Sequence, residues 1–235
     1  LSTIPANTLG VAQLIVKQEG VIAGVDIAKR VFKAIDSNII FNQKIKDGEN
    51  VKVGDIVFEV RGSTHTILSG ERLALNFMQR MSGIASTTSM YVEKLHGLKT
   101  KLLDTRKTTP LLREIEKMSV KLGGGENHRM GLYDMVMIKD NHIDFAGGIA
   151  DAIDACNSYL KKNKLNLKIE IEVRNRAELD QVLAKGGINR IMLDNFTPSL
   201  CVEAVKIIAG QCETEASGGI NLSNIKEYAE SGVTY

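Results

Sequence analysis

Residues 168–193 read KIEIEVRNRAELDQVLAKGGINRIML, which is a strand pattern, a helix pattern that ends at Gly186 and a second strand pattern. Two strands joined by a helix are typical of a parallel βα unit. The same alternation recurs from residue 98 onward and predicts strands at 99–103, 135–138, 168–173, 190–193 and 213–216, with helices near 110–122, 148–162, 176–186, 198–209 and 222–231. Five such units predict an α/β barrel, and residues 233–235 would open a sixth strand.

The first 97 residues have a different pattern, with short β-rich segments separated by Gly and Asp turns. We predict strands at 11–16, 39–41, 55–60 and 66–68. One helix is expected to begin at Asp26 as its N-cap, and a long helix covers 71–96 and stops at Gly97. The predicted division is therefore residues 1–97, a first domain with a linking long helix, and residues 98–235, the catalytic barrel domain.

Composition excludes several classes of protein. With 235 residues, 43% hydrophobic and 25% charged, the chain is long enough for a large core, and a net charge of +2 is too small to direct it to nucleic acid or an anionic membrane. The three cysteines, Cys156, Cys201 and Cys212, lack the spacing of a disulfide framework or zinc site. Because membrane-span and secretory-signal patterns are also missing, we expect a cytoplasmic protein.

Charged residues follow the predicted strands. In an α/β barrel the carboxyl ends of the strands meet at one rim, where functional side chains collect. The five junctions are 104–107, 139–142, 172–174, 194–195 and 217–219. If the units close, these junctions place cations, two carboxylates and a glycine pair in one mouth.

The cations at these junctions, together with Arg129 in the loop 123–129 before the second strand, suggest two anionic ligand groups. Arg106 and Arg129 offer planar forks suited to carboxylates or phosphates, whereas Lys107 and Lys139 act as point charges. Any one of them could be a solvated loop charge, but their occurrence at successive strand ends argues against that for the set. The Ser217-Gly218-Gly219 turn before a helix resembles a phosphate cradle, although such a pair is more often a tight turn.

The acidic residues Glu172 and Asp194 should meet a cation, a sugar hydroxyl or Mg²⁺. Pairing with a neighbouring Lys or Arg is the alternative, and it applies most readily to Glu170. His128 and His142 are too far apart for a local zinc motif, so we expect them to hydrogen-bond an anion and the backbone.

Seven strings in order give the chain a resemblance to the quinolinate phosphoribosyltransferase family. They are GERLALN (70–76), SGIA (82–85), DTRKT (104–108), GGENHR (124–129), IKDNH (138–142), MLDNF (192–196) and ASGGI (216–220). The resemblance implies a small N-terminal α/β sandwich beside an incomplete, open α/β barrel, and a homodimer whose active sites lie between subunits. It also implies that quinolinate and 5-phosphoribosyl 1-diphosphate give nicotinate mononucleotide, diphosphate and CO₂ with Mg²⁺, in NAD biosynthesis.

Site residues can be carried over from the family motifs one by one. The resemblance implies a quinolinate pocket that the neighbouring subunit's Arg72 completes, phosphoribosyl contacts, an acidic pair for the ribose hydroxyls and Mg²⁺, and a 5-phosphate loop. In that order the residues are Arg106, His128, Arg129 and Lys139; Lys107; Glu172 and Asp194; and Ser217, Gly218 and Gly219. Thr105 is a further expected substrate-binding residue. Lys139, Glu172 and Asp194 are the expected catalytic residues. Family members continue past Tyr235 with a glycine-containing loop, so we expect the sequence to be cut there.

Three other functions compete with this hypothesis. A relative with a changed substrate, such as the molybdenum-transport proteins, is disfavoured because Arg72, Arg106, His128, Arg129 and Lys139 occur together. Residues 47–55 resemble the hairpin of biotinyl and lipoyl carrier domains but lack the lysine tip, which indicates shared turn chemistry. A non-catalytic anion-binding protein could have kept the cations alone.

Overall fold

The computed structural model describes residues 2–235, which form two compact units. The first unit contains the chain up to Met90 together with Lys107–Asn127. The second contains Tyr91–Arg106 and His128–Tyr235. The units interleave along the chain, whereas the predicted division after residue 97 is a single cut.

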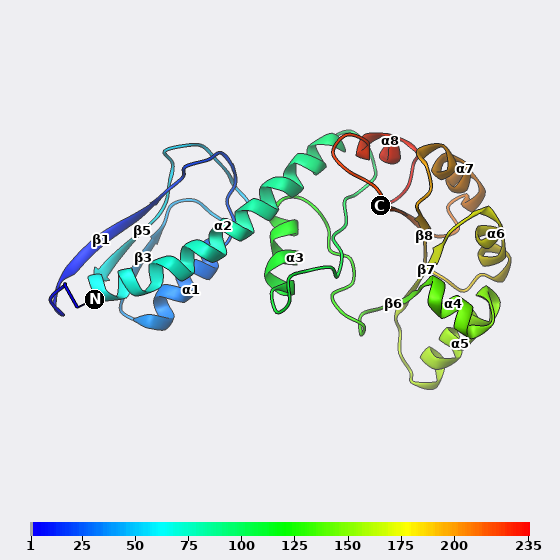
Figure 1. The fold of residues 1–235 in the computed structure, drawn as a ribbon, viewed down its shortest axis with the longest axis horizontal. Helices are drawn as coiled ribbons and strands as arrows, with labels where there is room; N and C mark the ends of the chain where they lie inside the picture. The colour runs from blue at the N-terminus through cyan, green and yellow to red at the C-terminus, as the bar shows by residue number, and fades with distance from the viewer. Residues whose placement is uncertain (1) are drawn as a thin grey trace. The chain divides into compact units, whose positions relative to one another are not determined.

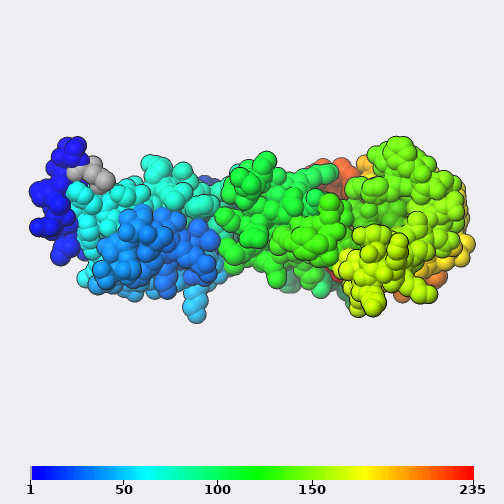
Figure 2. Space-filling model, turned by 90° about the horizontal axis from the view of Figure 1, so that it is seen from below, coloured from blue at the N-terminus to red at the C-terminus, as the bar shows by residue number. Residues whose placement is uncertain are grey.

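The first unit is built on an antiparallel sheet with strand order β1-β5-β3. Its strands and helices are β1 (Leu9–Ile15), β2 (Gly20–Val21), α1 (Val25–Ile35), β3 (Ile40–Gln43), β4 (Asn50–Val51), β5 (Ile56–Ser63), α2 (Thr64–Lys94) as far as Met90, and α3 (Arg113–Leu122). Helix α1 lies beside α2, as Figures 1 and 2 show. They pack closely because Gly70 has no side chain: a Cβ there would lie 2.8 Å from the ring of Phe32.

Two local predictions in this unit were wrong. Residues 66–68 belong to α2 and not to a strand, because an apolar run of three residues suits either structure. Helix α1 begins at Val25, and Asp26 is not its N-cap. The carboxylate of Asp47, from a turn far along the chain, instead accepts the backbone N–H groups of Val25 and Asp26, at 2.8 and 3.1 Å.

The second unit contains a parallel sheet with strand order β6-β7-β8-β9. Its strands are β6 (Met135–Ile138), β7 (Lys168–Val173), β8 (Arg190–Asp194) and β9 (Glu213–Ser217). Its helices are α4 (Asp140–Ala146), α5 (Ile149–Lys162), α6 (Arg176–Lys185), α7 (Pro198–Ile208) and α8 (Ile225–Glu230). Helices α5, α6 and α7 lie on one side of this sheet (Figure 1). The predicted parallel α/β architecture is confirmed.

The first and last predicted strands of the barrel differ in outcome. Residues 99–103 are not a strand of this sheet, and helix α3, which follows them, packs in the first unit. At the other end, the backbone N–H of Tyr235 donates to Thr214 and its carbonyl accepts from Ala216. Residue 235 therefore runs alongside β9, as predicted for a sixth strand.

The two faces of the parallel sheet have opposite character. Ile169, Ile171 and Val173 of β7 and Ile191 and Leu193 of β8 are buried in the core formed with the helices. The intervening residues point to the other face, because side chains alternate along a strand. Among residues 2–235, none of the helices has the length and apolarity needed to span a membrane.

Candidate active site on the polar face of the parallel sheet

Charged side chains occupy the face of the sheet that the helices leave uncovered. The strand register places Glu170, Arg190 and Glu213 side by side across β7, β8 and β9. Asp194 and Ser217 lie side by side four residues farther along, at the carboxyl end. Parallel sheets usually have apolar residues on both faces. A charged face therefore indicates a surface built for polar ligands.

Arg190 joins the carboxylates of this face into an ion network. Its guanidinium donates to Glu215 Oε2 at 3.0 Å and to Glu213 Oε2 at 3.1 Å, and lies 4.0 Å from the centre of the Tyr235 ring. Burial alone would lower the pKa of Arg190, but the charges of Glu170 and Glu215 outweigh it and raise that pKa. Burial, followed by the charge of Glu170, raises the pKa of Glu215 to about 7. The network thus holds more acid than its one arginine neutralises.

The side chain of His128 adjoins the carboxylates of this network and is almost completely buried. Its Nε2 lies 2.7 Å from Oε2 of Glu170 and 3.5 Å from Oε2 of Glu215. These three side chains could geometrically form a metal-ligand group. Because Arg190 already binds Glu215, however, they are better explained as part of the ion network.

Two arginines of the predicted quinolinate pocket share one region. Burial, and then the charge of Arg106, lower the pKa of Arg129. Arg129 also donates to the carbonyl of Met135 at 3.3 Å, which ties it to the start of β6. Two half-buried guanidinium groups that repel each other are stabilised by an anion between them. The structure therefore brings together the cations Arg106 and Arg129.

Lys139 and Glu172 form the next part of the rim. Lys139 precedes α4, and its ammonium lies 3.1 Å from Oε2 of Glu172 at the end of β7. The backbone N–H of Lys139 donates to Nδ1 of His142 at 3.0 Å, so the predicted backbone role of His142 is confirmed. The pair therefore joins a residue that is predicted to bind quinolinate, Lys139, to one that is predicted to bind the ribose, Glu172.

Asp194 and the glycine turn lie at the ends of β8 and β9. Oδ2 of Asp194 accepts from the amide of Asn195 at 2.8 Å, and the backbone N–H of Asn195 donates to the carbonyl of Ser217 at 2.7 Å. Gly218 has φ +100, and a Cβ there would lie 2.2 Å from Asn195 Oδ1. Glycine is therefore required at this position for both reasons.

Two of the residues named by the resemblance lie in the first unit. Arg72 is exposed on α2, and Lys107 is exposed just beyond Arg106. The remaining predicted site residues belong to the second unit. They are Thr105, Arg106, His128, Arg129, Lys139, Glu172, Asp194, Ser217, Gly218 and Gly219.

The network residues Arg190 and Glu215 were missed in the sequence. The sequence carried little signal for them, because RIMLD (190–194) and ETEAS (213–217) lack the strict alternation of polar and apolar residues that marks KIEIEV (168–173). Asp104, whose Oδ1 accepts the backbone N–H of His128 at 2.8 Å, was also not assigned a role.

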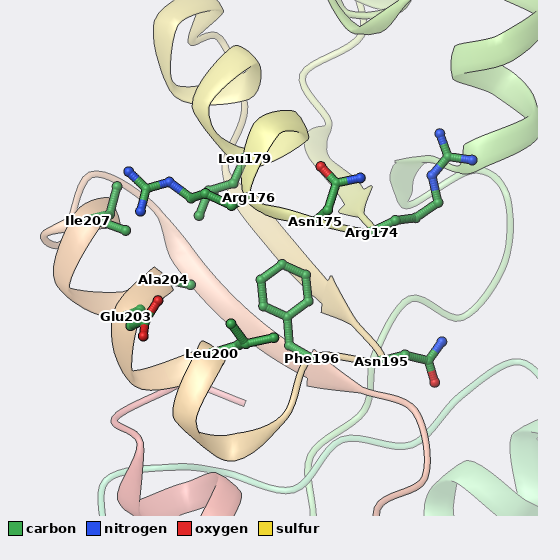
Figure 3. A pocket seen from close by; sticks show the side chains of 10 residues that line it. All are labelled: Arg174, Asn175, Arg176, Leu179, Asn195, Phe196, Leu200, Glu203, Ala204 and Ile207. Carbon is green, nitrogen blue, oxygen red and sulfur yellow. The ribbon is translucent and has the colours of Figure 1, made fainter.

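A cavity of about 150 Å³ lies elsewhere in this unit, between α6 and α7. Figure 3 shows the ring of Phe196 in its middle, with the guanidinium groups of Arg174 and Arg176 pointing to opposite sides. Arg174 pairs with Glu178 at 2.7 Å and Arg176 with Asp180 at 2.7 Å. Because its cations are engaged by neighbouring carboxylates, this cavity is a poorer anion site than the polar face.

Comparison with known proteins agrees with this geometry. The family described as quinolinate phosphoribosyl transferase, N-terminal domain, matches residues 1–82, and its C-terminal domain matches residues 84–235. Quinolinate phosphoribosyltransferase [decarboxylating] 1b of Nicotiana tabacum is 42% identical over 100% of this chain and 70% of its own length. The probable nicotinate-nucleotide pyrophosphorylase [carboxylating] of Bacillus subtilis is 40% identical over 95% of this chain and 76% of its own.

Solved structures show the same similarity in three dimensions. NadC from Streptococcus pyogenes has a TM-score of 0.94 and 38% identity, covering 100% of this chain and 81% of its own. The nicotinate-nucleotide pyrophosphorylase from Francisella tularensis has a TM-score of 0.93 and 38% identity, covering 99% of this chain and 81% of its own. With both domain families matched across its length, the chain belongs to the quinolinate phosphoribosyltransferase family.

Proposed function

We propose that the polar face of the parallel sheet is where this decarboxylating quinolinate phosphoribosyltransferase carries out its reaction in NAD biosynthesis. The observation that carries the assignment is the pair Arg106 and Arg129, in which burial and then the charge of Arg106 lower the pKa of Arg129. Quinolinate is a dianion, and two guanidinium forks match two carboxylates in charge and geometry. Lys139, at the adjacent rim, adds a third cation.

The ribose end of the donor is assigned to the carboxylates Glu172 and Asp194. When diphosphate leaves, positive charge develops on the ribose, and nearby carboxylates stabilise it. The turn formed by Ser217, Gly218 and Gly219 is assigned to the 5-phosphate, since Gly218 and Gly219 expose backbone N–H groups in left-handed conformations. Lys107 is assigned to the phosphoribosyl group.

Glu172 and Asp194 also suit Mg²⁺, because carboxylate oxygens are its preferred protein ligands and both residues end neighbouring strands. A Mg²⁺ ion held there would neutralise charge on the departing diphosphate. Lys139 already lies against Glu172, so donor binding would compete for that carboxylate.

The chain's main contribution is to hold two anions together. Arg106, Arg129 and Lys139 offset the charge of quinolinate, so its ring nitrogen can approach the ribose carbon that loses diphosphate. The new nitrogen–carbon bond leaves a cationic ring. That ring then takes the electron pair released when the adjacent carboxylate departs as CO₂, and a proton replaces the carboxylate.

We further propose that the active enzyme is a homodimer with a shared site. Arg72 supports this, because it is exposed on α2 and pairs with no carboxylate of residues 2–235. An arginine so placed is available to a neighbouring subunit. The cytoplasmic location stays a prediction, since plant relatives are named as mitochondrial or chloroplastic.

The deciding experiment mixes the purified chain with quinolinate, 5-phosphoribosyl 1-diphosphate and Mg²⁺. We expect equal amounts of nicotinate mononucleotide, diphosphate and CO₂, and no product when quinolinate or Mg²⁺ is left out. Binding of both substrates without formation of nicotinate mononucleotide would instead identify a non-catalytic anion-binding protein.

A further inference from the structure

His128 has both ring nitrogens engaged within its own chain. The backbone N–H of Arg129 donates to Nδ1 at 2.6 Å, and Nε2 lies 2.7 Å from Oε2 of Glu170. The side chain is only 6% exposed, and that of Glu170 is fully buried. No ring nitrogen is left in this arrangement to hydrogen-bond an anion.

These contacts define the tautomer of the ring. A backbone N–H can only donate, so Nδ1 must be the acceptor and cannot carry a proton. Nε2 then carries the ring proton and donates it to the carboxylate of Glu170. A protonated Glu170 donating to Nε2 would require the proton on Nδ1, which conflicts with the Arg129 contact.

Glu170 adjoins the ion network of Arg190. It sits beside Arg190 in the strand register, and Arg190 is bound to Glu213 and Glu215 on the next strand. Oε1 of Glu170 is buried and has no hydrogen-bond partner among residues 2–235. The contact between Oε2 and His128 is therefore the one hydrogen bond that this carboxylate makes among residues 2–235.

His128 in turn fixes the backbone of its neighbour. The ring accepts the N–H of Arg129, and the backbone N–H of His128 is tied to Asp104 at 2.8 Å. The side chain of Arg129 leaves the backbone from this anchored point and lies near Arg106. A free imidazole would leave the start of the Arg129 side chain without this restraint.

From this chain of contacts we propose that Glu170 is a positioning residue for the anion pocket. It locks His128 as the Nε2–H tautomer, and His128 holds Arg129 in place beside Arg106 without contacting quinolinate through a ring nitrogen. The inference rests on the proposed function only in naming quinolinate as the pocket's occupant. It revises the direct hydrogen bond to an anion that the sequence suggested for His128.

The first test observes the tautomer directly and requires no turnover. Long-range ¹H–¹⁵N spectra of the chain, which has four histidines, assign His128 by its loss in His128→Asn. We expect the wild type to show protonated Nε2 and unprotonated Nδ1, and Glu170→Ala to show averaging between tautomers. A protonated Nδ1, or averaging already in the wild type, overturns the proposal.

The second test separates positioning from general damage. Glu170→Ala should raise KM for quinolinate at least tenfold while KM for the phosphoribosyl donor changes less than twofold, because the ribose residues lie elsewhere on the rim. Glu170→Gln keeps an oxygen acceptor for Nε2–H and should recover most of the loss. Lys168→Gln, on the same strand and face but with a 60% exposed side chain, is the matched control and should behave as wild type.

The two failures can be told apart. If Glu170→Ala raises both KM values equally, or neither, the residue is structural or irrelevant and the positioning role is wrong. If Glu170→Ala does not fold, Glu170→Gln decides alone: wild-type kinetics with an unchanged tautomer support the proposal, and a tautomer change without a change in quinolinate KM overturns it. A wild-type chain that shows the tautomer but makes no product contradicts the proposed function instead.

Discussion

The ammonium of Lys139 lies 3.1 Å from Oε2 of Glu172, which links the cationic and acidic parts of the rim across β6 and β7. Lys139 is about half exposed, whereas Glu172 is mostly buried. Each of these side chains therefore neutralises the other. Quinolinate binding should draw Lys139 away from Glu172 and leave that carboxylate available to the donor.

We expect Lys139→Ala to lower activity at least tenfold, about 1.4 kcal/mol, with little change in melting temperature, because the side chain is about half exposed and not part of the apolar core. Calorimetric titration of quinolinate is the measurement. Lys206→Ala, an exposed lysine on α7, is the control and should bind normally. Arg106→Ala should resemble Lys139→Ala, and wild-type affinity in both variants would remove these residues from the pocket.

The acidic pair should respond differently. Glu172→Gln and Asp194→Asn are expected to leave quinolinate affinity nearly intact while lowering turnover at least tenfold, about 1.4 kcal/mol. Removing negative charge does not harm a site for a dianion, and Glu172→Gln also weakens the contact that holds Lys139 by removing the charge of its partner. Separate titrations of quinolinate and donor check this. Loss of quinolinate binding with normal donor binding would place the pair at the wrong ligand.

Gly218 and Gly219 offer a matched comparison within the turn. A Cβ at Gly218 would lie 2.2 Å from Asn195 Oδ1 and displace the amide that binds Asp194, whereas a Cβ at Gly219 meets nothing within 4 Å. Both positions have positive φ, so both alanines carry strain. We expect Gly218→Ala to raise the donor KM several-fold more than Gly219→Ala. Equal effects would show that strain alone is responsible.

Glu215 should make stability depend on pH. Its pKa is raised to about 7 from the ordinary 4.5, so between these values the folded chain holds a proton that the unfolded chain has released. This group's contribution to the free energy of unfolding is therefore largest below pH 4.5 and is lost as pH rises through about 7, by on the order of 3 kcal/mol.

Urea unfolding at about pH 5 and about pH 8 tests this sign. The wild type should lose more stability between the two conditions than Glu215→Gln, which cannot ionise but can still accept from Arg190. If both proteins lose the same amount, the ionisation of Glu215 is not the cause.

Several features of this chain could be predicted from sequence because their signals are local. Repeated strand and helix patterns predicted the parallel sheet, and the period of two in KIEIEV (168–173) is local enough to place Glu170 and Glu172 on one face of β7. The Asp47 cap of α1 could not be predicted, because the two segments are about twenty residues apart and meet only in the fold. The role of Arg190 was missed for a related reason, since its partners depend on the register between β8 and β9.

The last prediction concerns assembly and depends on Arg72. If the partner's pocket uses this residue, an Arg72→Ala subunit cannot complete its partner's pocket but keeps an intact polar face of its own. A Lys139→Ala subunit has the opposite defect. A heterodimer of the two inactive variants then contains one site that combines an intact polar face with Arg72 of the other subunit.

Co-expression of Arg72→Ala and Lys139→Ala chains with different tags, followed by purification through both tags, isolates that heterodimer. We expect it to recover up to roughly half of wild-type activity, by the two-site symmetry of a dimer. The separately purified variants, mixed without exchange of subunits, provide the control and should stay inactive. If Arg72 acts within its own subunit, each site of the heterodimer carries one defect, and its activity will not exceed that of the mixture.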